Sequence, residues 1–379
     1  MRSRIPRKEI KSLAFALYDT GETILGALVV STFFPLYITK HIDVKIYSLS
    51  YGISFLISFA SALLLGKIAD EKALRKKFFA LFSLLTSLFL ISLTPLYSVP
   101  LIALFAFLFM LISHQQAMVF YNSLLLNFEN KGFASGLGVS FGYIGSAAAL
   151  IFLAKSLKEP EVYTTVGVLF LILAIPSILL LENPKISSEV SIKEVFKDKN
   201  FLLFLVSLFS ITEVANTLIA MMGVYLREVY SLENPEIYRI IGLSALGGVI
   251  GGVFWGILTD KFSVNKIFPI GFLLWFSFFV FLFFATREIL ILVGLIAGFS
   301  LAHLWSTSRV YIVENFPKES VSVRMSFLSL TERVASSFGL FLWSFLLFIT
   351  KNDFKLSALL MGILPLIGLG VYIFTHGKR

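Results

Sequence analysis

A small set of ionisable and polar side chains lies within long apolar stretches of this sequence. In the first stretch Asp19 and Glu22 are three residues apart, so a helix would place them on one face. Glu213 and Asn216 repeat that spacing in the second half of the chain. The remaining members are His114, His303, Arg309 and Arg333. Carboxyl and imidazole groups can carry protons or bind a cationic group, and guanidinium groups bind carboxylates. Charged side chains at bilayer depth cost about 2.5–3.5 kcal/mol each on insertion scales, so we expect this set to have a function.

The acids and the histidines recur at half-chain spacing. Glu22 and Glu213 are 191 residues apart, and His114 and His303 are 189 residues apart. If the two halves are related by a two-fold axis, we expect each pair to face across one space near the membrane midplane. The alternatives are structural roles. Each histidine could form a hydrogen bond with a backbone carbonyl, and each acid could form a buried pair that only stabilises the fold.

Two arginines in the second half of the chain each have an alternative interpretation. Glu332 and Arg333 are adjacent and point about 100° apart on a helix, so we expect only Arg333 to face the central space. Arg309 lies nearer the inner end of its stretch, and a pair with Glu314 is the alternative to a site role.

The stretches that carry these residues are long enough to cross a membrane. Apolar residues make up 57% of the 379 residues and charged residues 15%, with a mean hydropathy of +0.88. A span needs roughly 20 mostly apolar residues. We predict twelve spans, near residues 12–39, 46–68, 78–96, 100–122, 133–154, 162–181, 201–226, 239–259, 267–286, 289–312, 324–349 and 356–375. The sequence therefore predicts an all-α, multi-pass protein of the cell membrane.

The distribution of cations predicts the orientation. With the N-terminus inside, the cytoplasmic segments hold 21 Lys and Arg residues and the external loops hold nine. Both termini are then cytoplasmic. Residues 182–200 form the longest polar stretch, and we predict that they are a cytoplasmic linker between two similar bundles, 1–181 and 201–379. The excess of cations next to spans also explains the net charge of +9 without a nucleic-acid partner.

A duplicated turn supports the two-bundle interpretation. Gly66 and Asp70 close the second span, with Arg75 among the cations that follow, and Gly256, Asp260 and Lys261 close the eighth. The two aspartates are 190 residues apart. Glycine allows helices to approach closely, and an aspartate there can accept bonds from basic groups or from the first amides of a neighbouring helix. The alternative is an ordinary solvated turn.

This Gly-x-x-x-Asp-basic pattern resembles the signature loop of the major facilitator superfamily. The resemblance implies two pseudo-symmetric six-helix bundles around a central cavity, lined by helices 1, 4, 7 and 10. It also implies alternating access, with the loop as a cytoplasmic gate. Glu71 departs from the family pattern, in which a basic residue usually follows the aspartate directly.

Further short motifs resemble the vacuole-effluxer-like (autophagy-related amino-acid effluxer) group of that superfamily. They include Tyr18-Asp19, Phe33 to Tyr37, Phe120 to Ser123, Gly142 to Gly145, Ser308-Arg309 and Phe327 to Gly339. Fungal members of that group export neutral amino acids from the vacuole. Glu22 stands where the group usually has asparagine, so the substrate does not carry over directly.

Other chemistries lack their usual signatures. There is no cysteine, no phosphate-binding glycine loop and no nucleophile–histidine–acid spacing, and the four histidines are too scattered to predict zinc. We therefore expect no enzyme, metal or cofactor. We expect a monomeric secondary transporter of a small polar or zwitterionic solute such as an amino acid, with proton coupling as one prospect. An exporter of apolar drugs or lipids and a non-transporting receptor or scaffold are the alternatives.

Overall fold

The computed structural model describes residues 7–376, apart from the side chains of residues 7, 234 and 376. Within that range the regular elements are helices, and no strand occurs. Twelve helical stretches are long and apolar enough to cross a membrane. The predicted all-α fold with twelve spans is therefore confirmed, with span ends that differ from the predicted ones by a few residues.

The first six crossings form the N half. Their elements are α1 (Arg7–Leu25), η1 (Gly26–Phe33), α2 (Phe34–Ile38), α3 (Val44–Glu71), α4 (Arg75–Leu96), α5 (Pro100–Ser123), η2 (Leu124–Asn127), α6 (Lys131–Ala148), η3 (Ala149–Leu153), α7 (Ala154–Ser156) and α8 (Glu161–Leu180). The segments η1 and η3 are π-helical and lie against each other. The first and fifth crossings are therefore composite helices that stay helical along their length, so their backbone groups are satisfied internally, as lipid requires.

The last six crossings form the C half. Its elements are α10 (Lys199–Tyr230), α11 (Asn234–Phe262), α12 (Val264–Ile267), α13 (Ile270–Phe284), η4 (Arg287–Ile289), α14 (Leu290–Asn315), η5 (Lys318–Ser320), α15 (Val321–Ile349), α16 (Phe354–Met361) and α17 (Ile363–His376). The short helix α9 (Ile192–Lys197) precedes it. Asp198 ends α9 and caps α10 by accepting a bond from the amide of Phe201.

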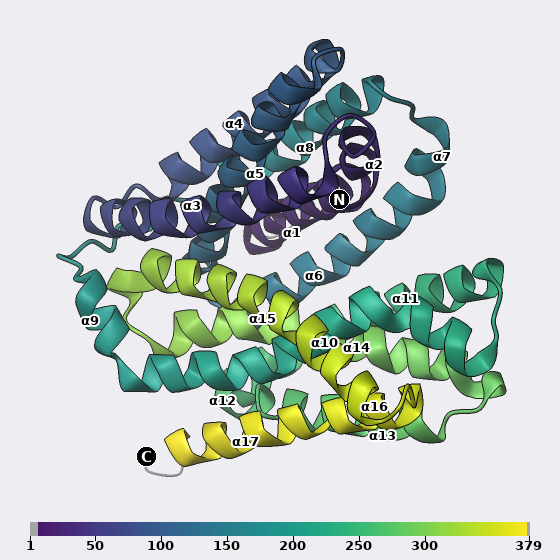
Figure 1. Cartoon of the computed structure of the whole chain (residues 1–379). Coiled ribbons are helices and arrows are strands. Elements are labelled where there is room, and N and C mark those ends of the chain that lie inside the picture. The colour runs from purple at the N-terminus through teal and green to yellow at the C-terminus, as the bar shows by residue number, and fades with distance from the viewer. Residues whose placement is uncertain (1–6, 377–379) are drawn as a thin grey trace, which may run out of the picture.

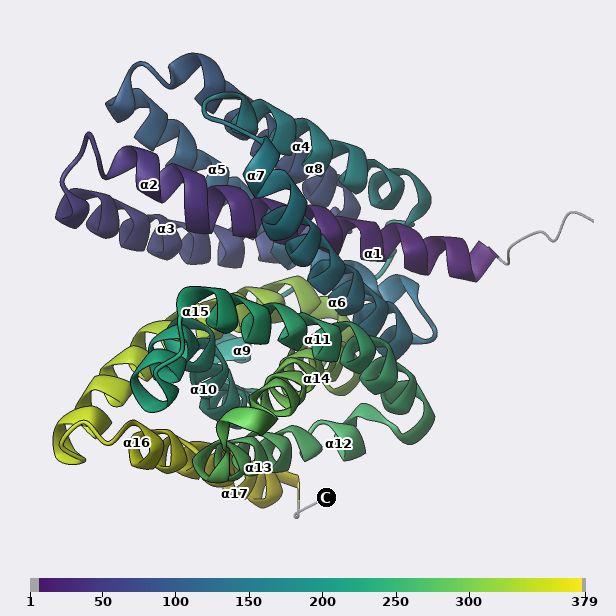
Figure 2. The same ribbon diagram turned by 90° about the vertical axis from the view of Figure 1, so that its right-hand side faces the viewer.

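The two halves are separate helical bodies (Figure 1), and they pack together mainly through six helices. Helix α6 packs against α11 and α14, and α15 packs against α3 and α5. Figure 2 shows α6 lying between the rest of the N half and α11. These six helices hold the two halves around a shared interior, which is where the sequence places the candidate site.

Candidate functional site

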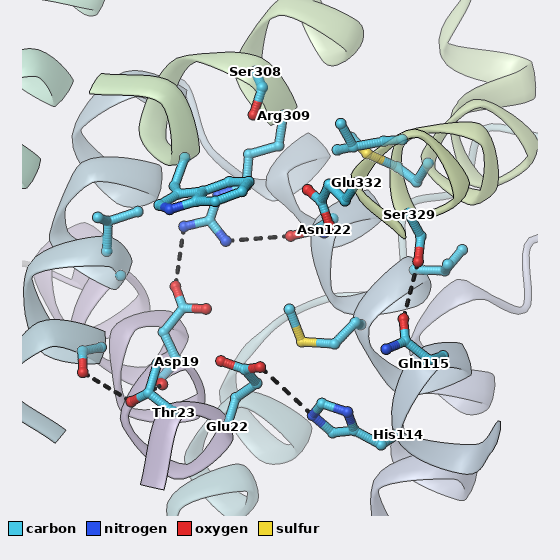
Figure 3. Close-up of a pocket in the computed structure, with 18 of the residues that line it drawn as sticks. Asp19, Glu22, Thr23, His114, Gln115, Asn122, Ser308, Arg309, Ser329 and Glu332 are labelled. Carbon is cyan, nitrogen blue, oxygen red and sulfur yellow. Dashed lines mark hydrogen bonds and ion pairs between the residues drawn. The ribbon is translucent and has the colours of Figure 1, made fainter. Parts of the chain in front are cut away.

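A cavity of about 370 Å³ lies between the two halves. Helices α1, α5 and α6 of the N half and α14 and α15 of the C half supply almost all of its wall. Helix α10 adds only Ile219. Figure 3 shows how the polar side chains of the wall lie. Five of the eight predicted site residues line it, namely Asp19, Glu22, His114, Arg309 and Arg333. The expected lining by the first, fourth and tenth crossings is thus seen, whereas the seventh crossing contributes little and the fifth and eleventh contribute more than expected.

The acidic side of the cavity comes from α1. Glu22 points into the space, with its side chain 25% exposed, and its Oε1 lies 3.8 Å from Nε2 of His114 on α5 (Figure 3). His114 itself is buried, and its Nε2 makes no hydrogen bond to a described residue. This arrangement leaves a carboxyl that faces the cavity and is held only loosely by its neighbour.

Asp19 is bound much more tightly, because Arg309 reaches it from the other half. The guanidinium Nη2 donates to Asp19 Oδ2 at 3.0 Å and to the carbonyl of Ser135 at 2.7 Å. Its Nε donates to Ser135 Oγ at 2.6 Å, and Nη1 donates to Asn122 Oδ1 at 3.2 Å. Both charged side chains are nearly buried. One cation of α14 is therefore tied to three helices of the N half.

Two aromatic rings and one glycine surround this ion pair. The guanidinium carbon of Arg309 lies 5.4 Å from the ring centre of Phe15 and 5.7 Å from that of Tyr121, so both rings can stabilise its charge. At Gly138 a Cβ would come within 2.0 Å of Asp19 Oδ2. Position 138 on α6 must therefore lack a side chain if the carboxylate is to reach its partner.

The cationic side of the cavity comes from α15. Arg333 lines the cavity and lies 4.5 Å from the ring centre of Phe55 on α3, and it makes no ion pair within the described residues. Glu332 also lines the cavity. The expectation that only one of the two faces the space is wrong, because the cavity is wide enough for two positions 100° apart on the helix to reach it.

Uncharged polar residues complete the wall, and Thr23, Ser308 and Ser329 among them were not predicted as site residues. Ser329 Oγ on α15 donates to Gln115 Oε1 on α5 at 2.9 Å and so links the halves beside the cavity. Thr23 and Ser308 also line it. Thr23 directly follows Glu22, and Ser308 directly precedes Arg309. This adjacency is the signal in the sequence that could have pointed to them.

Glu213 and Asn216 lie elsewhere, which corrects the expected acid pair. Glu213 is 1% exposed and packs where α10 meets α15, so that a Cβ at Gly339 would approach its Cγ to 2.9 Å. Asn216 Nδ2 donates to the carbonyl of Glu332 at 3.2 Å. Neither lines the cavity. The prediction that Glu213 faces Glu22 across it is therefore wrong, because the close approach of α10 and α15 encloses the C-half acid.

His303 is likewise absent from the cavity wall. Its Nε2 lies 2.9 Å from the carbonyl oxygen of Ile267, and its ring packs edge-on against Trp255 at 4.8 Å. The side chain is fully buried beside Gly271, where a Cβ would approach it to 2.5 Å. The structural alternative holds for His303, and the expected face-to-face pair with His114 is not formed.

The first loop aspartate closes one end of the interface, here called the inner end. Asp70 is fully buried and accepts bonds from the amides of Ser322 and Val323, the second and third residues of α15, at 3.1 Å each. Arg75 forms an ion pair with it at 2.8 Å and donates to the carbonyl of Ile186 at 2.7 Å. An anion at a helix N-terminus satisfies unpaired amides and the helix dipole.

Gly66 belongs to the same contact. A Cβ there would lie 3.2 Å from the backbone of Ser322 and Val323. The glycine thus lets α3 approach the start of α15.

The second loop aspartate repeats this arrangement in the opposite direction. Asp260 at the end of α11 accepts bonds from the amides of Gly132 and Phe133 at the start of α6, both at 2.7 Å. At Gly256 a Cβ would approach the carbonyl of Gly132 to 2.5 Å, so α6 and α11 pack at backbone distance. Each aspartate therefore caps a helix of the other half.

The basic residue next to the second cap does not bind its aspartate as Arg75 binds Asp70. Lys261 does not pair with Asp260; its Nζ lies 5.2 Å from the ring centre of Phe262. The alternative partner considered for Arg309 is also taken, since Glu314 pairs with Lys131 at 2.7 Å. The second cap thus lacks an equivalent of Arg75 among the described ion pairs.

Comparison with known proteins agrees with this architecture. Residues 203–378 match the family model described as Major Facilitator Superfamily. A protein of Aquifex aeolicus (strain VF5) described as uncharacterized is 79% identical over 375 residues, which is 99% of each chain, and the two chains therefore belong to one family.

Two solved structures share the fold over nearly the whole chain. One is a bacterial homologue of the iron transporter ferroportin in an outward-facing state, with a TM-score of 0.78 and 17% identity, covering 99% of this chain and 100% of that one. The other is the major facilitator transporter FucP in an outward conformation, with a TM-score of 0.78 and 12% identity over 99% of each chain. At these identities the likeness shows the fold alone, which is the major facilitator fold.

Proposed function

We propose that this chain, with the major facilitator fold and a major facilitator domain in its C half, is a secondary transporter of a small polar or zwitterionic solute. The solute would bind in the cavity between the halves and cross by alternating access. Cation counts on the two sides of the membrane support cytoplasmic termini, so the closed inner end would be cytoplasmic and the described state would face outward. We expect the protein to act as a monomer in the cell membrane.

The observation that carries this proposal is the separation of opposite charges in the cavity. Glu22 enters from the N half and Arg333 from the C half, and neither is held in a close ion pair by any residue that the structure describes. A zwitterion could place its ammonium group at Glu22 and its carboxylate at Arg333. Because the two groups belong to different halves, such a solute would favour a state in which the halves close around it. Charged walls of this kind favour polar cargo over apolar drugs or lipids.

Asp19 and Arg309 would have a second role in the same cycle. Their ion pair joins α1 to α14 close to the inner end, so it must separate when that end opens. A proton on Asp19 or Glu22, or a substrate carboxylate bound by Arg309, would weaken the links that hold the halves together. Proton coupling is therefore a natural extension of the proposal. FucP, which shares the fold, is a fucose:proton symporter.

The proposal is tested with purified protein in proteoliposomes. Uptake of labelled amino acids, sugars and organic cations is measured with and without a pH gradient. We expect uptake of a zwitterionic solute that falls at least tenfold in Glu22→Gln and in Arg333→Gln. Arg287→Gln is the matched control, because Arg287 is an exposed arginine that pairs with Glu236 away from the cavity. Wild-type uptake by both cavity variants would refute the proposed site.

A further inference from the structure

A second cavity lies inside the C half, with a volume of about 120 Å³. It is bounded by α10, α11, α13 and α14. Thirteen of its fourteen lining residues are apolar or glycine, and the exception is Ser244. The hydroxyl of Ser244 already donates to the carbonyl of Ile241 at 2.6 Å. The wall therefore offers a ligand apolar contact and little else.

This side compartment adjoins the central cavity. Ile219 on α10 lines both spaces. Along α14 the compartment is lined as far as Leu301, and the central cavity begins at Trp305. Four residues of helix correspond to about 6 Å. A solute held in the central cavity could therefore extend an apolar group past Ile219 into the compartment.

The size of the compartment sets the size of that group. An apolar cavity of about 150 Å³ in another protein stays dry and binds benzene. A compartment of 120 Å³ can accordingly hold a branched aliphatic group or a small ring. A purely polar solute such as a sugar would gain nothing from it, because hydroxyl groups there would find no partner.

We infer that the side compartment is a specificity pocket for the apolar substituent of the transported solute. The cargo is then an amphipathic zwitterion or ion, with a charged head between Glu22 and Arg333 and an apolar group of about four to seven carbon atoms beyond Ile219. This inference rests on the proposed function, since it describes the same site and names its substrate class.

Binding of a graded series tests the inference. Glycine, alanine, valine, leucine and phenylalanine share one head group and differ in their apolar part. Affinity for the purified protein, measured by isothermal titration calorimetry, should rise along the series, by about tenfold or more from alanine to leucine. Ala297→Leu, which fills the compartment, should remove most of this gain while leaving glycine and alanine binding within about twofold. Ala220→Leu is the matched control, because Ala220 is exposed on α10 and lines neither cavity.

A second variant guards against a folding defect in the first. Ile219→Ala widens the passage between the two spaces, and it should improve binding of phenylalanine relative to alanine. The inference would be overturned if affinity rose equally along the series in the wild type and in Ala297→Leu. It would also be overturned if affinity did not rise along the series in the wild type.

The outcomes also separate this inference from the proposed function. Binding of glycine and alanine with a flat series leaves the function intact and removes only the specificity pocket. Binding of no charged solute at all removes both. A phospholipid seen by native mass spectrometry on the wild type and lost from Ala297→Leu, with unchanged amino-acid selectivity, would assign the compartment to lipid instead.

Discussion

The N half and the C half use equivalent positions for different purposes. Glu22 on α1 and His114 on α5 face the central cavity, 3.8 Å apart. Their counterparts at half-chain spacing, Glu213 on α10 and His303 on α14, are buried in the C half, and neither lines the cavity. A repeated backbone therefore does not imply a repeated site.

The C half brings its charge to the cavity from other positions. Arg309 and Arg333 supply the cations, and Glu332 adds an acid beside them. The N half thus contributes mainly acids and the C half mainly cations. This asymmetry lets one solute contact both halves through groups of opposite charge, which two identical sets of acids could not do. The following predictions test how far it extends.

The largest effect is expected at the buried ion pair that crosses between the halves. Arg309→Met leaves Asp19 buried without its cation, and breaking such a pair costs about 3–5 kcal/mol. We expect a lower unfolding temperature in detergent and loss of transport. The double variant with Asp19→Asn should regain stability because no unpaired charge remains, but it should not regain transport. Full stability of the single variant would contradict the described network.

The two aspartate caps should differ in strength. Asp70 is fully buried and carries Arg75, whereas Asp260 is exposed and has only the helix amides among the described partners. A helix-terminal charge is worth up to about 2 kcal/mol when partly buried and less than about 1 kcal/mol when exposed. Asp70→Asn should therefore open the inner end in a larger fraction of molecules than Asp260→Asn.

The absence of native cysteines makes this comparison direct. Spin labels on cysteines introduced at Lys77 and Lys318, both exposed near the first cap, report the separation of the halves by pulsed electron paramagnetic resonance. A longer distance should appear mainly in Asp70→Asn. An equal or larger shift in Asp260→Asn would show that the two caps are energetically alike.

The smallest effect is expected at an exposed ion pair outside the spans. Lys8 Nζ lies 2.5 Å from Glu129 Oε2, and both side chains are largely exposed. The hydrogen bond and charge of Lys8 lower the pKa of Glu129. A lowered carboxyl pKa stabilises the fold above the unfolded value, about 4.3, and that contribution is lost as pH falls through the folded value.

Lys8→Gln should accordingly have an effect only above about pH 4, and a small one, because solvent screens exposed pairs. Thermal unfolding followed from pH 3 to pH 8 measures it. A destabilisation as large as that of Arg309→Met would remove the contrast between exposed and buried pairs.

The sequence predicted the spans and much of the cavity, because both follow from the cost of polar groups in lipid. Long apolar stretches define the crossings, and the rare charged residues within them had to lie in the interior. Asp19, Glu22, His114, Arg309 and Arg333 were identified on that basis. The half-chain spacing of Asp70 and Asp260 likewise drew attention to the two loop aspartates, which cap helices of the opposite half.

The rotation of each helix could not be predicted in the same way. Spans that are apolar on all sides carry almost no periodic signal, so the face that Glu213 or His303 presents is set by packing against distant helices. Glu213 is enclosed because Gly339 lets α15 approach α10. The pairing of Asp19 with Arg309 depends on Gly138, a contact between three helices that spacing within one helix does not reveal.

The difference between the two acids is tested most directly by transport as a function of pH. Glu22→Gln and Glu213→Gln remove equivalent carboxyl groups from the two halves. The account predicts that Glu22→Gln abolishes solute uptake or its pH dependence, and that Glu213→Gln transports with the wild-type pH profile. Normal transport by Glu22→Gln together with a loss in Glu213→Gln would contradict the assignment of the site to the central cavity.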